Sequence, residues 1–470
     1  MSLQQHLDNT TTPKRILALD GGGIRGALSL GYLQRIEDIL RAQNGGSADF
    51  RLCDYFDLIG GTSTGSIIAS CLAIGMKVDD IRKMYFDLGG KIFAKKYKWW
   101  KVFQLDELIH AGYDEHPLEE ELQKVFGDIT LGSDKIKTGL CIVAKRADTN
   151  SVWPLINHPN GKYYDSAHGK NKDILLWKAV RASAAAPSYF IPQTVDVGGG
   201  LPVAAFVDGG VSMANNPALQ LLLVATLHGF PFHWKPGADN LLVVSVGTGM
   251  SKLDKLPQDI TKNNLLNWAQ QIPDMFMQDA SWHNQIILQW MAKSPTAWQI
   301  DSEIGDLKDD LLVTDTNNKG LLSYLRYNMW LTKDDLDKLM DKQYTQQQVD
   351  DLVEMSNAAS RFELYDIGYK AAKENVAEEH FDKRFTIDQS NKAGNEVKYF
   401  KTGAVPDLPY AQATKKPIPV RCYKMNEPFV VETIEGTLRG KPGDYLMVGV
   451  NDELYPCEKE IFEKTYSLNS

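Results

Sequence analysis

The sequence predicts an α/β protein with a mostly parallel sheet covered by helices on both faces, followed by a small all-β module. Short apolar runs of β character alternate with segments whose apolar residues have helical spacing, which is typical of parallel strands joined by helices. With 470 residues, 43% of them hydrophobic, the chain is long enough for one large domain and a smaller one. The composition changes near residue 386, where large aliphatic side chains become few.

The expected elements of the large domain follow in order from residue 16. The apolar run 16–20 ends in three glycines, and the segment 26–43 after it carries apolar residues at helical spacing until it reaches the glycines at 45 and 46. Further strands are expected at 55–60, 138–144, 204–208 and 240–246, and further helices at 64–75, 173–186 and 216–229. Residues 261–385 are polar and mostly helical in pattern, and we expect them to pack around this core.

The changes in pattern predict the domain boundaries. We expect the α/β domain to span residues 14–385, a linker or extended segment residues 386–418, and a β-rich module residues 419–470. The module contains Lys441-Pro442-Gly443-Asp444-Tyr445 and resembles a short PGDY-bearing element found at the ends of various phage and bacterial proteins. Because Gly and Pro in turns are mostly structural, we interpret it as a capping element.

Charge and cysteine content argue against several classes of protein. The net charge of −9 disfavours a nucleic-acid-binding protein, which needs a basic surface. The five cysteines include no C-x-x-C pair, so they fit neither a disulfide framework nor a zinc site. We see no signal peptide and no apolar run long enough to cross a membrane. The sequence therefore predicts a soluble, cytoplasmic protein without a metal or cofactor.

A nucleophile elbow is predicted at Gly61-Thr62-Ser63-Thr64-Gly65. G-x-S-x-G between a strand and a helix makes a tight turn, so its flanking positions must be small and its serine hydroxyl stands exposed above the sheet. The N–H group of the following residue and the helix dipole then face an oxyanion. The alternative is a serine that only caps the helix.

The glycine-rich loop at 20–26, DGGGIRG, has two interpretations. Gly21, Gly23 and Gly26 match the dinucleotide fingerprint G-x-G-x-x-G, but no strand that ends in an acidic residue follows about 20 residues later, as that fold requires. Three glycines before a helix also leave N–H groups free for an oxyanion. We favour the oxyanion hole. Arg25 would brace this loop or meet a phosphate head group, or else form a structural ion pair.

A serine nucleophile needs a base, and Asp208 is the preferred candidate. AAFVD runs into Gly209-Gly210, which places this carboxylate at the end of a strand, where the sites of α/β proteins gather. The alternative is an aspartate in an ordinary turn before glycine. His228 and His283 come late enough in the chain to serve as a base instead, although neither lies in a motif.

Together these motifs resemble the patatin-like phospholipase family. DGGGIRG (20–26), GTSTG (61–65) and DGG (208–210) occur in the family's order, and ASAAAP (182–187) resembles its small-residue segment. The resemblance covers about residues 14–385 and is strongest before residue 250.

The resemblance implies a three-layer α/β/α sandwich and a Ser–Asp dyad without a catalytic histidine. Ser63 would be the nucleophile and Asp208 the base. The backbone of Gly21, Gly22 and Gly23 would form the oxyanion hole, with Arg25 beside it. The elbow glycines would be Gly61 and Gly65, and those of the Asp motif Gly209 and Gly210.

The implied activity is hydrolysis of fatty-acyl esters of phospholipids or lysophospholipids, with no nucleic acid as partner. Two alternatives stay open: an acyltransferase that uses the same acyl-serine, and a non-catalytic lipid- or nucleotide-binding protein. Some bacterial members of the family are membrane-degrading effectors switched on by a partner or a nucleotide, so an unidentified protein or nucleotide activator is a further expectation. The sequence does not indicate the oligomeric state.

A basic, aromatic segment is the candidate for membrane contact. KIFAKKYKWWK, at 91–101, combines five lysines with four aromatic residues and suits an anionic lipid surface. Lys95, Lys96, Trp99 and Trp100 would make transient contact with the inner face of the membrane. The alternative is a helix that packs its aromatic residues inward.

Overall fold

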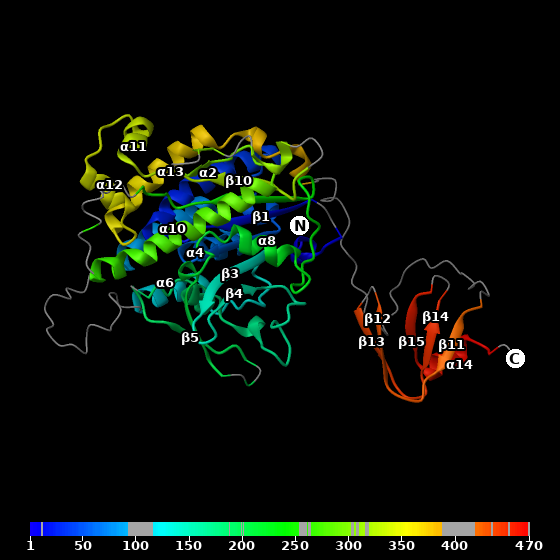
Figure 1. Ribbon diagram of the computed structural model, residues 1–470. Coiled ribbons are helices and arrows are strands. Elements are labelled where there is room, and N and C mark those ends of the chain that lie inside the picture. Colours follow the sequence, from blue (N-terminus) through cyan, green and yellow to red (C-terminus); the bar gives the residue numbers. More distant parts are fainter. Residues whose placement is uncertain are drawn as a thin grey trace. The chain divides into compact units, whose positions relative to one another are not determined.

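The computed structural model divides into two compact units, residues 1–395 and residues 396–470, which are treated separately below. Figure 1 shows the chain coloured from the amino to the carboxyl terminus. The described residues are all those of the chain except 11–12, 93–115, 188, 199, 201, 253–260, 262–264, 302–304, 307–309, 315–318, 388–418, 434–435, 450–451 and 469–470.

An eight-stranded sheet organises the first unit. Its strands run in the order β10-β7-β1-β2-β3-β6-β5, with β4 also paired to β3. The strands are β1 (Lys14–Leu19), β2 (Leu58–Thr62), β3 (Gly139–Arg146), β4 (Ser151–Ile156), β5 (Gln193–Val195), β6 (Ala204–Asp208), β7 (Leu241–Val246) and β10 (Ser323–Tyr327). The strands β10, β7, β1, β2 and β3 are parallel, whereas β4 and β6 run antiparallel to β3. The expectation of a mostly parallel sheet is confirmed.

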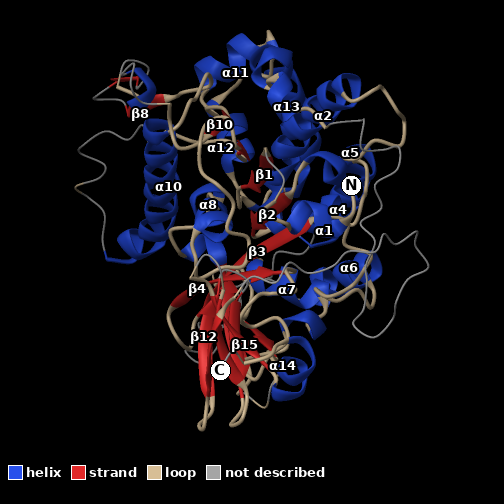
Figure 2. Ribbon diagram, turned by 90° about the vertical axis from the view of Figure 1, so that its right-hand side faces the viewer, coloured by secondary structure: helices blue, strands red, loops and turns tan. Residues whose placement is uncertain are grey.

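Helices cover both faces of this sheet. The α-helices of the unit are α1 (Leu3–Leu7), α2 (Gly26–Gln43), α3 (Leu52–Tyr55), α4 (Thr64–Ala73), α5 (Val78–Ile92), α6 (His116–Phe126), α7 (Leu176–Ser183), α8 (Ala218–Thr226), α10 (Leu265–Met291), α11 (Lys333–Met340), α12 (Gln346–Val353) and α13 (Arg361–Asn375). In Figure 2, α8 and α10 lie on one side of β1 and β2, and α2, α4 and α5 lie on the other.

The alternation of side chains along β1 explains the three layers. Leu17 and Leu19 belong to the apolar core shared with α2, α5 and α13, whereas Ile16 and Ala18 belong to the core shared with α8 and α10. Successive side chains of a strand point to opposite faces, so a strand that is apolar at every position is buried on both. The three-layer α/β/α sandwich is therefore confirmed.

Several elements differ from the sequence-based expectation. The strand expected at 55–60 begins at Leu58, because Tyr55 ends the short helix α3. The region 261–385 is not only helical: it contributes β10 to the edge of the sheet, next to β7, and a two-stranded sheet of β8 (Gln299–Asp301) and β9 (Gly305–Asp306). The alternating polar and apolar residues of β10 are too few to stand out among long helical patterns.

The second unit has its own small core. Its elements are β11 (Arg421–Lys424), β12 (Phe429–Thr433), β13 (Gly436–Gly440), β14 (Tyr445–Val448), β15 (Leu454–Cys457) and α14 (Lys459–Thr465). β11, β14 and β15 form one sheet, β12 and β13 form a hairpin, and the Tyr445 ring stacks on Phe462 of α14. In the PGDY stretch, the Asp444 carboxylate accepts hydrogen bonds from the Lys441 and Lys459 N–H groups at 2.8 and 3.1 Å. This aspartate therefore holds a turn together.

Candidate active site

Ser63 occupies a strained turn between β2 and α4. Its backbone has φ 53° and ψ −126°, a conformation that non-glycine residues rarely adopt and that is typical of a nucleophile on a strand–helix turn. The Ser63 side chain makes no capping hydrogen bond to α4. The interpretation of Ser63 as an ordinary helix cap therefore does not describe this turn.

Close backbone contacts explain the two glycines of the elbow. A Cβ atom on Gly61 would lie 2.2 Å from the Gly65 carbonyl, and one on Gly65 would lie 2.3 Å from the Leu19 carbonyl oxygen. Both distances are far shorter than a van der Waals contact, so neither position has room for a larger residue. The contact with Leu19 also brings the end of β1, and the glycine loop that follows it, against the first turn of α4.

Asp208 reaches Ser63 because two strands meet end to end. β4 pairs with one edge of β3 over residues 141–146, so β2 and β6 share the other edge. On that edge Thr62, the last residue of β2, pairs with Val143, and Asp208, the last residue of the antiparallel β6, pairs with Ala144. The carboxyl ends of the two strands therefore meet, and Asp208 lies beside the turn that carries Ser63.

The environment of Asp208 suits a base. Its side chain is 4% exposed, accepts a hydrogen bond from the Gly210 N–H at 2.7 Å, and lies close enough to the Ser63 hydroxyl for that group to lower its pKa. Burial raises the pKa of Asp208 from 3.8 to about 6, and the neighbouring Ser63 hydroxyl and Gly210 N–H oppose that rise. Asp208 is therefore a carboxylate that is ionised at neutral pH and has a higher affinity for a proton than an exposed aspartate.

The small-residue segment 182–187 connects the backbones of Ser63 and Asp208. Ser183 Oγ accepts a hydrogen bond from the Ser63 N–H at 2.9 Å and donates one to the Val143 carbonyl at 2.6 Å. Two residues later, the Ala185 carbonyl accepts a hydrogen bond from the Asp208 N–H at 2.9 Å. Sequence reasoning noted this segment but assigned it no role, since a short run of alanines around one serine does not indicate its partners.

The glycine loop is fixed by hydrogen bonds at nearly every peptide group. The Gly21 N–H donates to the Asn215 carbonyl at 3.1 Å, and the Gly21 carbonyl accepts from Thr248 Oγ1 at 3.0 Å. The Gly22 carbonyl accepts from the Arg25 N–H, and the Gly23 carbonyl accepts from the Tyr85 hydroxyl at 2.6 Å. Neither Asn215, Thr248 nor Tyr85 was singled out from the sequence, because each lies in a different segment and meets the loop only in the folded chain.

Two N–H groups of this loop are left available. Among the hydrogen bonds of the described residues, the Gly22 and Gly23 N–H groups have no acceptor, and neither has the N–H of Thr64 at the start of α4. The Gly21 N–H, which we expected in an oxyanion hole, is already bound to Asn215. Gly21 contributes its small size instead, since a Cβ atom there would lie 3.2 Å from the Ser63 Cβ.

A buried ion pair anchors the start of the loop. Both carboxylate oxygens of Asp20 accept hydrogen bonds from the Arg326 guanidinium, at 2.9 and 2.6 Å, and Arg326 is 2% exposed. This bidentate geometry joins β10 to the loop and compensates the burial of both charges. The charge of Arg25 also lowers the pKa of Asp20, although less than that of Arg326 does.

The other sequence candidates lie elsewhere. His228 is exposed, and its ring is 5.4 Å from that of His233. His233 precedes Trp234, whose ring lies beside Lys14 at the amino end of β1. Ser63 lies at the opposite, carboxyl end of the parallel strands. His283 is exposed on α10. In the described part of the chain, neither imidazole forms a hydrogen bond or ion pair with Ser63 or Asp208. Lys95, Lys96, Trp99 and Trp100 lie outside the described residues.

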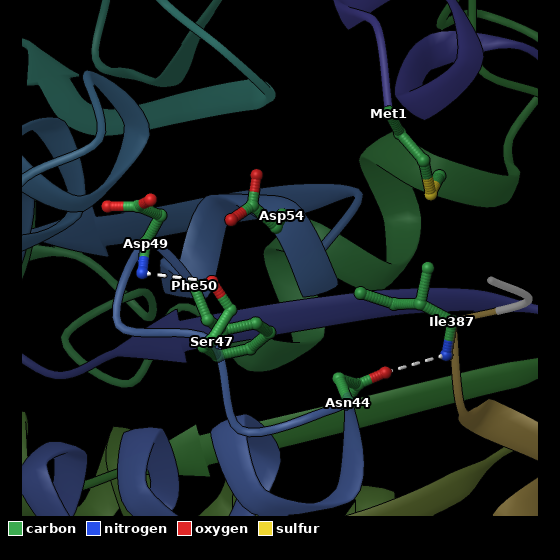
Figure 3. Close-up of a pocket in the computed structure, with 7 residues that line it drawn as sticks. All are labelled: Met1, Asn44, Ser47, Asp49, Phe50, Asp54 and Ile387. Atoms are coloured by element: carbon green, nitrogen blue, oxygen red, sulfur yellow. Dashed lines mark hydrogen bonds between the residues drawn. The ribbon is translucent and has the colours of Figure 1, made fainter. Parts of the chain in front are cut away.

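A cavity of about 220 Å³ is also remote from Ser63 (Figure 3). Its lining consists of Met1, Asn44, Ser47, Asp49, Phe50, Asp54 and Ile387. Asp54 belongs to α3, which precedes the amino end of β2, whereas Ser63 follows the carboxyl end. The Asp54 carboxylate already accepts a hydrogen bond from the Arg51 N–H at 2.8 Å.

The described residues offer neither a metal site nor a membrane-spanning helix. No group of three or more His, Cys, Asp or Glu side chains there is arranged to hold a metal ion. None of the described helices is long and apolar enough to span a bilayer.

Comparison with known proteins assigns the family. The model of the patatin-like phospholipase family matches residues 17–222, which include Ser63 and Asp208. Patatin-like protein 2 of Arabidopsis thaliana is 30% identical over 296 residues, which cover 57% of this chain and 69% of that protein. The chain belongs to the patatin-like phospholipase family.

Two bacterial proteins are also similar to this patatin-like chain. A protein of Escherichia coli named cGAMP-activated phospholipase is 32% identical over 44% of this chain and 55% of its own length. A protein of Vibrio cholerae with the same name is 33% identical over 46% of this chain and 57% of its own length. The patatin-like chain thus spans a little over half the length of these relatives.

Proposed function

We propose that this patatin-like chain is a serine acyl hydrolase that cleaves fatty-acyl esters of phospholipids or lysophospholipids. The observation that carries the proposal is the pairing of Ser63, in its strained turn, with the buried carboxylate of Asp208. A hydroxyl that lies beside a carboxylate with a pKa near 6 has a base close by to take its proton. No other residue is needed for that step.

The proposed reaction has two halves. Asp208 takes the proton of Ser63 as Oγ attacks the ester carbonyl, and the Gly22 and Gly23 N–H groups donate hydrogen bonds to the resulting oxyanion. Collapse of the tetrahedral intermediate releases the lysolipid or alcohol, which leaves with the proton from Asp208, and forms acyl-Ser63. Asp208 then activates a water molecule that hydrolyses the acyl-enzyme to fatty acid and free Ser63.

Exposed apolar side chains near Asp208 support an acyl substrate. Val211 and Met213, which follow the Asp208-Gly209-Gly210 motif, are 40% and 46% exposed. On α10, the sulfur of Met277 would lie 3.6 Å from a Cβ atom on Gly210, and the neighbouring Phe276 is 58% exposed. Apolar side chains that gather at the surface near a site favour an apolar ligand.

The test is fatty-acid release from vesicles of mixed phospholipid and lysophospholipid. We expect Ser63→Ala and Asp208→Asn to abolish release, whereas Ser70→Ala, which removes a buried hydroxyl from the same helix α4, leaves it unchanged. Full activity of Ser63→Ala would overturn the proposal. Full activity of Asp208→Asn alone would leave the nucleophile in place but require a different base.

Regulation by a nucleotide is a further part of the proposal. The names of the E. coli and V. cholerae relatives state that cGAMP activates them. Fatty-acid release measured with and without cGAMP tests this, and equal rates would exclude that activator.

We also propose transient contact of residues 91–101 with anionic membrane, which their five lysines and four aromatic residues support.

A further inference from the structure

We propose that Thr248 is a positioning residue whose side chain fixes the direction of the Gly22 N–H group. The inference rests on the proposed function, in which this N–H binds the oxyanion. Thr248 follows β7 in the turn 247–249 and is 3% exposed. It lies far from the glycine loop in the sequence and was not among the residues singled out there.

The Thr248 side chain makes two kinds of contact with the loop. Its Oγ1 donates a hydrogen bond to the Gly21 carbonyl oxygen at 3.0 Å. It also lies directly against the α-carbon of Gly22, since a Cβ atom on Gly22 would be 2.3 Å from Thr248 Oγ1. The hydroxyl therefore holds one end of the peptide group between Gly21 and Gly22 and occupies the space beside it.

Peptide geometry transmits this contact to the proposed oxyanion donor. The Gly21 carbonyl and the Gly22 N–H belong to one planar trans peptide, so they point in opposite directions. A hydrogen bond that fixes the carbonyl also fixes the N–H. This constraint matters here because glycine has wide backbone freedom, and the peptide lies between two glycines. The other bonds of the loop, from the Gly21 N–H and to the Gly22 carbonyl, hold the two neighbouring peptides.

Thr248 is itself held by a rigid turn. The Gly247 N–H donates to the Tyr327 carbonyl and the Gly249 N–H donates to Asn328 Oδ1, both at 2.8 Å. On the other side of the turn, Ser29 Oγ of α2 donates to the Gly247 carbonyl at 2.7 Å. Thr248 therefore connects a fixed turn at the carboxyl end of β7 to one of the two peptides whose N–H groups face the oxyanion in the proposed reaction.

The experiment compares kcat and KM for hydrolysis of p-nitrophenyl fatty-acyl esters. Thr248→Val keeps the shape of the side chain and removes the donor, whereas Thr248→Ser keeps the donor. Thr138→Val is the matched control, because it removes another buried threonine hydroxyl that donates to a backbone carbonyl, that of Phe56 at 2.6 Å, away from the glycine loop. Thr248→Ala takes the place of Thr248→Val if that variant does not fold.

We expect Thr248→Val to lower kcat about tenfold with KM little changed, since a misdirected donor weakens binding of the transition state more than binding of the ester. This is less than the roughly 100- to 1,000-fold loss that follows removal of an oxyanion donor. Thr248→Ser and Thr138→Val should keep the wild-type kcat.

Each other outcome overturns a distinct statement. A wild-type kcat in Thr248→Val, with Ser63→Ala inactive, refutes the positioning role and leaves the proposed function intact. An equal loss in Thr248→Ser shows that shape rather than the hydrogen bond matters, which also refutes it. Wild-type activity in Ser63→Ala, or no activity in the wild type both with and without cGAMP, removes the proposed function and this inference with it.

Discussion

Replacing Asp208 by Asn should stabilise the protein at neutral pH while it abolishes activity. The pKa of Asp208 is raised by burial from 3.8 to about 6 in the folded chain. The folded state therefore binds the proton more tightly than the unfolded state does, so ionisation of Asp208 opposes folding. Below about pH 4, Asp208 is protonated in both states and the protein keeps the stability that its tighter proton binding provides. That stability is lost as the pH rises through 6. Asn has nearly the same shape and carries no charge.

The size of the effect follows from the two pKa values. The displacement from 3.8 to about 6 corresponds to about 3 kcal/mol at neutral pH, at roughly 1.4 kcal/mol for each pKa unit. Asp208→Asn should recover up to that amount, because its amide oxygen can still accept the Gly210 N–H. A gain in stability at the cost of activity is typical of substitutions in catalytic sites.

The assay is urea unfolding of wild type and variant, followed by tryptophan fluorescence at about pH 7.5 and about pH 4.5. We expect a larger free energy of unfolding for Asp208→Asn at the higher pH and a much smaller difference at the lower one. Asp128→Asn, at a side chain that is 94% exposed, is the control and should change stability by less than about 0.5 kcal/mol. An Asp208→Asn variant that is no more stable than wild type at the higher pH, or equally favoured at both, would refute this reasoning.

Three further predictions concern the same site. In the wild type, kcat/KM should fall about tenfold for each pH unit below the Asp208 pKa of about 6, because the base becomes protonated. A pH–rate profile with a soluble ester measures this, and a flat profile down to about pH 5 would contradict a base with this pKa. Gly61→Ala should lower the free energy of unfolding in urea by at least about 1–3 kcal/mol, since its Cβ would lie 2.2 Å from the Gly65 carbonyl. Gly229→Ala, which has open space around it, should leave stability unchanged, and equal effects of the two variants would argue against the close contact. Arg326→Met should destabilise the fold by about 3–5 kcal/mol, because it leaves the buried Asp20 carboxylate unpaired, and a loss below 1 kcal/mol would show that this pair is not needed.

Local signals predicted the central layer of the fold well. Each of the strands β1, β3, β6 and β7 was recognised as a short apolar run, and the helix after the glycine loop was recognised by its periodicity. The edge strands β4, β5 and β10 were not recognised. They are short or lie within polar surroundings, and it is their pairing partners rather than their own composition that make them strands.

The candidate residues Ser63 and Asp208 were found for a similar reason. A nucleophile elbow and an Asp-Gly-Gly turn each need small residues at fixed spacing, so a few adjacent residues of the sequence indicate the backbone geometry. The donors of the proposed oxyanion hole were predicted less well. The sequence suggested three equivalent glycine N–H groups, but the Asn215 carbonyl binds that of Gly21. A hydrogen bond between segments nearly 200 residues apart leaves no local signal.

The sequence by itself determined that this chain forms an α/β sandwich with a serine turn, a glycine loop and a carboxylate at a strand end. Those features depend on backbone sterics and hydrophobic periodicity, which act over a few residues. Only the tertiary structure decided that β6 runs antiparallel to β3 and meets the end of β2, so that Asp208 reaches Ser63. It likewise decided which N–H groups of the glycine loop are free, because Asn215 and Thr248 come from other segments of the chain. These outcomes depend on strand pairing and on contacts between distant segments, and both form only when the helices and the sheet pack against one another.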